Sequence, residues 1–190
     1  MGATESQPLS SLTPAEVALL SSSTHYSDEE IVQLHQQFSF DVGGPAVSAS
    51  VFAAFLATAG VLDPVVPALL FRGFDADRDG IITFTELVRG LSAMTRGTND
   101  ERIRFAFRMY DEQGTGVVGR DSLIANLRAL RRAFGPLHPY HGPHTDDGAD
   151  EDELVSIAMH GLRDVLTYED FDLYVQSHPS CVRGLALQVG

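Results

Sequence analysis

The chain has a single cysteine, Cys181, among its 190 residues. One thiol alone forms no intrachain disulfide and does not suffice for a cysteine-based zinc site. No apolar run approaches the roughly 20 residues that span a bilayer, and the N-terminus lacks both the basic start and the apolar core of a signal peptide. These absences predict a soluble protein that is not secreted, and they favour a reducing, cytoplasmic compartment.

Basic side chains are scarce as well. The 13 Lys and Arg residues stand against 26 Asp and Glu residues, which gives a formal net charge of -13. This balance disfavours nucleic acid and anionic surfaces as partners, and it suits cations or basic partner segments. No nucleophile, base and orienting acid recur in a catalytic pattern, so we do not expect an enzyme. What the chain does have is 44% hydrophobic residues, enough to fill a core.

Signals for helix starts recur along the chain. In 13–16 and in 27–30 a hydroxyl residue is followed three residues later by glutamate, which is the pattern of a capping box. Apolar residues at helical spacing and further start signals predict additional helices. These lie over about 50–59, from 63, over 83–94, from 99, and over 120–134, 150–160 and 167–176. The sequence therefore predicts an all-α fold in which helix, loop and helix repeat.

One stretch between two of these helices carries a metal-binding pattern. Residues 75–86 read D-A-D-R-D-G-I-I-T-F-T-E and match the calcium loop of an EF-hand, D-x-D-x-D-G followed by five residues and glutamate. Ca²⁺ takes six to eight oxygen ligands, and this spacing supplies them. The predicted ligands are Asp75, Asp77, Asp79, the carbonyl of Ile81, Thr83 directly or through water, and both oxygens of Glu86. Four carboxylates predict an affinity between about 10 nM and 10 µM, and Mg²⁺ is expected to compete.

A second candidate loop, 111–122, reads D-E-Q-G-T-G-V-V-G-R-D-S. It keeps the first aspartate and the turn glycine of the pattern, but its last position is serine instead of a bidentate glutamate. Only one of its candidate ligands is a carboxylate. These candidates are Asp111, Gln113, Thr115, the carbonyl of Val117, and Ser122. We therefore expect a weak or vestigial metal loop here.

Two further hands are recognisable only from the spacing of apolar residues around their loops, near Val47 and near Leu166. Neither keeps the ligands: Val51 stands where the final glutamate belongs, and 160–164 lacks alternating oxygen side chains. EF-hands nevertheless pair, because the short strand of each loop needs a partner for its backbone groups. The sequence therefore predicts four hands paired into two lobes, with short β-bridges between the paired loops.

These hands divide the chain. An N-terminal leader, 1–24, precedes an N-terminal lobe, 25–97, which holds the degenerate first hand and the calcium-competent second hand. The C-terminal lobe, 98–177, holds the degraded third hand and the degenerate fourth hand, and a tail, 178–190, follows. An acidic insertion rich in glycine, proline and histidine, 134–150, interrupts the C-terminal lobe and is predicted to be mobile.

Across 27–188 the chain resembles the calcineurin B, neuronal calcium sensor and calaxin group of EF-hand proteins. The sequences at 70–75, 90–97 and 41–44 are most similar to calaxin, the calcium sensor of ciliary outer dynein arms. The stretch 104–111 is instead similar to calcineurin B. The chain departs from calaxin in its third and fourth loops, where that family keeps calcium ligands.

The resemblance implies a regulator without enzymatic activity, in which calcium reshapes an apolar groove that accepts an amphipathic helix of a partner. The calaxin-like stretches imply a calcium sensor or light-chain-like subunit of an axonemal dynein assembly in a cilium or flagellum, with a dynein or microtubule-associated partner. The calcineurin B-like stretch leaves a regulatory subunit of a phosphatase or kinase as the alternative. A structural EF-hand component, whose ion only stabilises the fold, is the third possibility.

The first six residues fit the pattern for N-myristoylation at Gly2. A single acyl chain supports only reversible binding to membranes, so a membrane partner is expected only if Gly2 is acylated. Two other clusters have alternative interpretations. Exposed histidines in the insertion (His138, His141 and His144) form either a transition-metal site or an unliganded loop, and a basic helix face (Arg128, Arg131 and Arg132) is either solvated or bound to an acidic partner.

Overall fold

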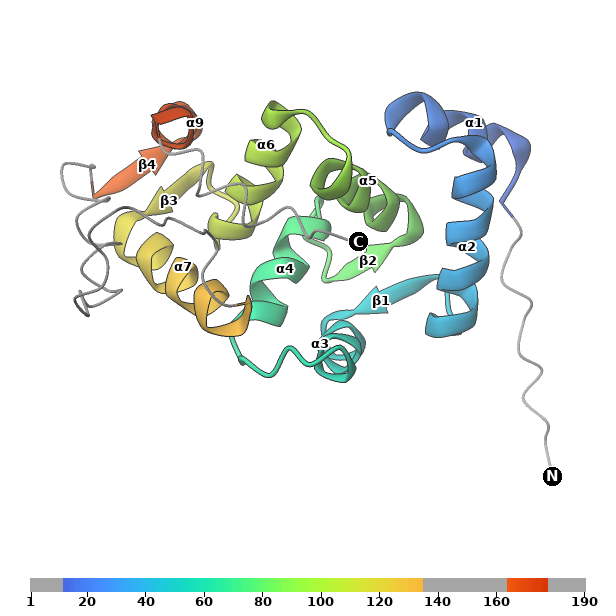
Figure 1. Ribbon diagram of the computed structural model, residues 1–190, viewed down its shortest axis with the longest axis horizontal. Helices are drawn as coiled ribbons and strands as arrows, with labels where there is room; N and C mark the ends of the chain where they lie inside the picture. The colour runs from blue at the N-terminus through green and yellow to red at the C-terminus, as the bar shows by residue number, and fades with distance from the viewer. Residues whose placement is uncertain (1–11, 135–163, 178–190) are drawn as a thin grey trace, which may run out of the picture.

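The computed structural model describes residues 12–134 and 164–177 (Figure 1). Within these ranges the chain forms helices joined by short loops and two pairs of short strands, as expected for an all-α EF-hand fold. The helices are α1 (Pro14–Ser23), α2 (Asp28–Val42), α3 (Ala49–Thr58), α4 (Val66–Phe74), α5 (Phe84–Thr95), α6 (Asn99–Tyr110), α7 (Arg120–Phe134) and α9 (Tyr168–Ser177). The predictions for Gly2, for the helix at 150–160, for 135–150 of the insertion and for the tail lie outside the described residues. No helix in the described ranges is both long and apolar enough to cross a membrane.

Reciprocal capping boxes start four of these helices. In each, a hydroxyl side chain accepts from the N–H of a glutamate three residues on, and that glutamate accepts from the backbone N–H of the cap. The caps are Thr13, Ser27, Thr83 and Thr98. The predicted boxes at 13–16 and 27–30 are therefore confirmed. Helix α1 runs to Ser23, and the hydroxyls of Ser22 and Ser23 donate to the carbonyl of Leu19 in the preceding turn.

The strands pair the loops two by two. Strand β1 (Ala46–Ser48) lies antiparallel to β2 (Ile81–Thr83), with Val47 opposite Ile82. Strand β3 (Val117–Gly119) lies antiparallel to β4 (Val165–Thr167), with Val118 opposite Leu166. All four of these facing side chains are buried. A hand that lacks calcium-binding residues thus still pairs its strand with the loop of the neighbouring hand, as the sequence predicted.

Helices α4 and α6 pack side by side at the centre of the molecule (Figure 1). Gly73 allows this approach, because a Cβ atom there would lie 2.7 Å from both Phe105 Cζ and Met109 Cγ. The rings of Phe74 and Phe105 meet edge to face with their centroids 5.2 Å apart. Since α4 ends at the loop that begins with Asp75, and α6 ends at the loop that begins with Asp111, the two candidate loops start from one packed helix pair.

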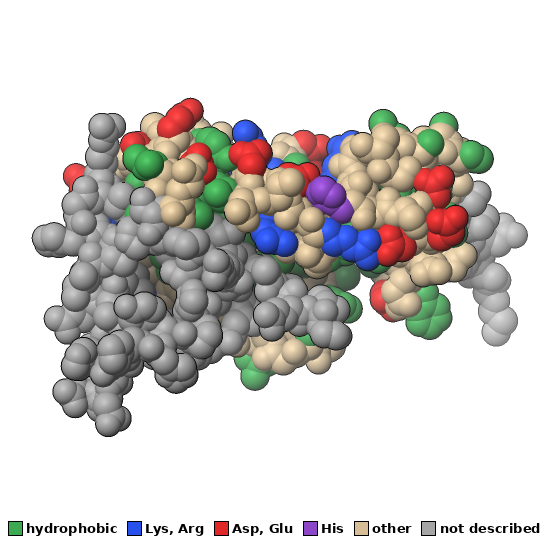
Figure 2. All heavy atoms as spheres, turned by 45° about the horizontal axis from the view of Figure 1, so that its top comes forward, with side chains coloured by type: hydrophobic (Ala, Val, Ile, Leu, Met, Phe, Trp, Pro, Cys, Tyr) green, Lys and Arg blue, Asp and Glu red, His purple; other side chains and the backbone are tan. Residues whose placement is uncertain are grey.

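Exposed contacts link the N-terminal part of the chain to the end of α5 and the start of α6. Arg96 forms an ion pair with Glu30 at 2.6 Å, and Nε2 of His25 lies within hydrogen-bond distance of Oε2 of Glu101, at 2.9 Å. The Arg96 hydrogen bond, together with the N–H of Ser27, lowers the pKa of Glu30 to about 2. Figure 2 shows basic side chains in the middle of one face with acidic side chains beside them. Contacts this exposed contribute little stability.

Candidate metal centre

Loop 75–86 connects the end of α4 to the start of α5. Asp75 caps α4, with its N–H donating to the carbonyl of Phe71 at 2.8 Å. The turn requires left-handed backbone at two positions, Arg78 with φ 62° and Gly80 with φ 88°. Glycine adopts such a φ freely, whereas arginine does so at a cost of about 1–2 kcal/mol. The chain then enters β2, which holds the second half of the loop against β1.

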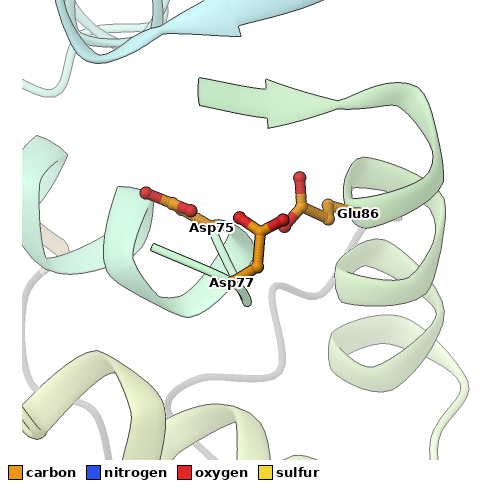
Figure 3. A group of neighbouring side chains, drawn as sticks. All are labelled: Asp75, Asp77 and Glu86. Carbon is orange, nitrogen blue, oxygen red and sulfur yellow. The ribbon is translucent and has the colours of Figure 1, made fainter. Parts of the chain in front are cut away.

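Three of the predicted ligands converge in this loop. Asp75 comes from the end of α4, Asp77 from the turn and Glu86 from the first turn of α5 (Figure 3). Each offers a carboxylate oxygen within 4.8 Å of those of the other two. In the described part of the chain this is the only such group of three or more His, Cys, Asp or Glu side chains. The spacing suits a cation held between them.

The helix cap of α5 also fixes the position of Glu86. Its Oε2 accepts from the N–H of Thr83 at 3.0 Å and from the Thr83 hydroxyl at 2.8 Å, and its Oε1 accepts from the N–H of Ala76 at 2.9 Å. Burial raises the pKa of Glu86, but the hydrogen bonds from Thr83, Ala76 and Asp77 outweigh it and leave the pKa below its ordinary value. Glu86 is therefore held ionised and faces the other two carboxylates.

Asp75 has an oxygen that nothing in the described protein satisfies. The residue is only 6% exposed. Its Oδ2 accepts from the N–H of Gly80 at 3.1 Å, whereas its Oδ1 is buried without a hydrogen-bond partner. Burial raises the pKa of Asp75, and the nearby carboxylates of Glu86 and Asp79 add to this. A hard cation would bind Oδ1 of Asp75 and offset the repulsion between the neighbouring carboxylates. The residues of this loop therefore fit a calcium ion.

The other predicted ligands lie in the same loop, but their oxygens make local contacts. Asp79 Oδ1 accepts from the N–H of Ile81 at 2.9 Å, and the Thr83 hydroxyl donates to Glu86. Asp77 Oδ1 in turn accepts from the N–H of Asp79 at 3.2 Å. These turns fold the loop around the site. The assignment of all six residues as calcium ligands, Asp75, Asp77 and Glu86 included, stays a prediction.

The third loop, 111–122, is organised differently. Asp111 is buried, and both of its carboxylate oxygens bind its own loop, Oδ1 the N–H of Thr115 at 3.0 Å and Oδ2 the N–H of Gly116 at 2.8 Å. A further neighbour is Arg78, whose Nη2 donates to the Asp111 carbonyl at 2.6 Å. Sequence reasoning missed this contact, because an arginine at the fourth position of a calcium loop has no pattern that predicts where its side chain reaches.

The raised pKa of Asp75 predicts a pH dependence. Because the metal-free fold holds a proton on Asp75 more tightly than the unfolded chain does, protonation stabilises the metal-free fold as the pH falls through the raised pKa. Ca²⁺ requires the ionised form and competes with that proton. We expect the rise in melting temperature on adding Ca²⁺ to be largest at neutral pH and to shrink as the pH falls towards and through the raised pKa of Asp75. A rise that stays constant over this range in circular dichroism melts would contradict the role of Asp75.

The class of protein follows from the fold and this loop: helices flanking twelve-residue loops, with the loops paired through short antiparallel strands, define an EF-hand protein. No family model matches the chain. It is 36% identical over 127 residues to calcium-binding protein NCSA of Dictyostelium discoideum, a match that covers 67% of this chain and 68% of that protein.

Two further relatives cover more of the chain. Calaxin of Xenopus laevis is 31% identical over 165 residues, which cover 80% of this chain and 76% of calaxin. Neuronal calcium sensor 1 of Lymnaea stagnalis is 28% identical over 180 residues, with 94% of each chain covered. The chain belongs to the family of EF-hand calcium sensors that includes these proteins, as the resemblance in the sequence predicted.

Proposed function

We propose that the protein is a calcium-dependent regulator that binds one Ca²⁺ ion in loop 75–86. The observation that carries this proposal is the buried Oδ1 of Asp75, which has no partner in the described protein and lies beside two further carboxylates. The ligands would be Asp75, Asp77, Asp79, the Ile81 carbonyl, Thr83 and Glu86. Mg²⁺ would compete at the low calcium concentration of a resting cell. Loop 111–122 would bind weakly or not at all.

A second part of the proposal concerns a protein partner. A surface depression of about 500 Å³ lies between α3 and α4 and is lined mainly by small apolar side chains. Leu62, which belongs to this lining, is 81% exposed. An amphipathic helix of a partner would place its apolar face here. Since α4 leads directly into loop 75–86, ion binding at Asp75 would change the angle of the helix that forms one wall.

The partner that we favour is an axonemal dynein assembly, with the protein located in a cilium or flagellum. Support comes from the calaxin-like stretches 70–75 and 90–97 and from the match to calaxin. The calcineurin B-like stretch 104–111 supports the alternative, a regulatory subunit of a phosphatase or kinase. Capture of partners from a ciliated-cell lysate separates the two, because the first recovers dynein or microtubule-associated chains and the second a catalytic phosphatase or kinase chain.

Calorimetric titration of Ca²⁺ in the presence of Mg²⁺ tests the proposed function. We expect one site on the full chain, with an affinity between about 10 nM and 10 µM. Two sites would mean that loop 111–122 binds an ion as well. A single site without any calcium-dependent change in exposed apolar surface, measured with a hydrophobic dye, would favour a structural component. No site would contradict the proposal.

A further inference from the structure

Helices α4 and α6, which lead into the second and third loops, each extend an arginine side chain to the C-terminal end of the other helix. Arg72 of α4 donates from Nε to the carbonyl of Met109 at 3.0 Å. Arg108 of α6 donates from Nε and Nη2 to the carbonyl of Gly73, each at 3.3 Å. Both arginines stand three residues before the first aspartate of a loop. Each helix end therefore receives a cation from the other helix, where its free carbonyls attract positive charge.

Arg78 adds a third contact, which comes from within the calcium loop itself. Its Nη2 donates to the carbonyl of Asp111 at 2.6 Å, and its Nη1 donates to the carbonyl of Glu112 at 3.3 Å. Nη2 also lies 4.0 Å from Oδ2 of Asp111. The guanidinium thus binds the end of α6 and the first residues of the third loop. Charge-assisted bonds in this fixed fork geometry are stronger than neutral ones.

The third loop is shaped around this arginine. Gly114 has φ 67°, and a Cβ atom there would lie 2.7 Å from Nε of Arg78. The N–H of Gly114 donates to the same Asp111 carbonyl, at 3.4 Å, that accepts from Arg78. Any side chain at 114 would displace the guanidinium, so glycine there serves the contact as well as the turn.

The backbone of Arg78 is fixed by the residues that would bind the ion. It lies between Asp77 and Asp79 and has left-handed backbone, which arginine adopts only when its surroundings impose it. An ion held by the carboxylates on either side would fix this backbone further. The side chain that extends from it ends on the third loop.

We propose that Arg78 couples ion binding in loop 75–86 to the conformation of the third loop, whose first two carbonyls accept from the Arg78 guanidinium. This inference rests on the proposed function of loop 75–86. It gives the degraded third hand a role: loop 111–122 responds to calcium without binding it. The response passes to β3, which lies in the second half of that loop, and to α7, which begins at its end. By linkage the state of the third loop affects ion binding in the second.

The amide resonances of the turn glycines report on each loop separately. In a Ca²⁺ titration followed by ¹H–¹⁵N NMR, we expect Gly80, Gly114 and Gly116 to shift with one common midpoint. In Arg78→Asn, which tolerates left-handed backbone but lacks the guanidinium, Gly80 should still shift. The shifts of Gly114 and Gly116 should fall at least threefold. Arg78→Lys, which keeps the charge without the fork, should give an intermediate response.

Arg89→Ala is the matched control, because Arg89 is an exposed arginine on α5 outside the loop, and it should leave all three glycine shifts as in the wild type. The continued shift of Gly80 in Arg78→Asn would show that the variant is folded. If Gly80 does not shift in the wild type, the proposed function fails and the coupling fails with it. If Gly80 shifts but Gly114 and Gly116 do not, only the coupling is overturned. A separate midpoint for Gly116, or a full response in Arg78→Asn, also overturns it.

Discussion

Replacing Glu86 by glutamine should weaken calcium binding about a hundredfold or more while leaving the fold intact. Glu86 is the one predicted ligand that would supply two oxygens and a full charge. The amide of the substituted side chain would lack that charge and would turn an N–H group towards the cation. A hundredfold loss of affinity corresponds to about 2.7 kcal/mol, which is within the range for loss of a charged ligand.

The fold should survive because glutamine serves as well as glutamate at the third position of a capping box. Glutamine can still accept from the N–H and the hydroxyl of Thr83, which Glu86 holds at 3.0 Å and 2.8 Å. The substitution therefore removes the role of residue 86 as a calcium ligand and keeps its role in the capping box of α5. Without calcium the melting temperature should fall only slightly, through the lost acceptor for the N–H of Ala76, whereas the rise on adding calcium should shrink to that of a site at least about a hundredfold weaker.

Glu101→Gln is the matched control for this substitution. Glu101 holds the same position in the capping box of α6, where it accepts from the N–H of Thr98 at 2.6 Å, but it lies outside the loop. Calorimetry should show one site of wild-type affinity in Glu101→Gln and a site at least about a hundredfold weaker in Glu86→Gln. If Glu86→Gln binds calcium within about threefold of the wild type, the ion lies elsewhere.

The calcium loop was predictable from the sequence because its requirements are local. An ion needs oxygens at fixed spacing, a sharp turn needs glycine, and the cap of α5 needs a hydroxyl three residues before a glutamate. All of these fall within 75–86. The pairing of the first two loops was also predicted, from the apolar residues around Val47, and in the structure Val47 lies opposite Ile82 with both side chains buried.

The contacts between hands were not predictable in the same way. That Arg78 reaches Asp111, and that Gly73 admits Phe105, depends on how α4 crosses α6. No spacing in the sequence encodes this crossing. The start of α4 shows a smaller difference. Helix was expected from Asp63, but Asp63 accepts from the N–H of Val65 at 2.9 Å in a turn, and α4 begins at Val66.

Replacing Phe105 by alanine should cost about 3–5 kcal/mol of unfolding free energy, the range for buried phenylalanine. The side chain is 1% exposed and lies where three helices meet. Its ring contacts Phe74 of α4 edge to face, and Cε2 would lie 3.2 Å from a Cβ atom at Gly90 of α5. Neighbours this close-packed cannot collapse fully into the space of the lost ring, so a cavity would add to the lost burial.

This substitution should also lower calcium affinity, although Phe105 contacts no predicted ligand. Helices α4 and α5 flank loop 75–86, and Phe105 fixes their relative position from α6. Urea denaturation with and without calcium measures both effects, with Phe55→Ala as the control, since Phe55 is 58% exposed and should cost no more than about 0.5 kcal/mol. If Phe105→Ala costs no more than Phe55→Ala, the packing of α4 against α6 does not support the calcium loop. A large cost with unchanged calcium affinity would show that the second hand holds its geometry without help from α6.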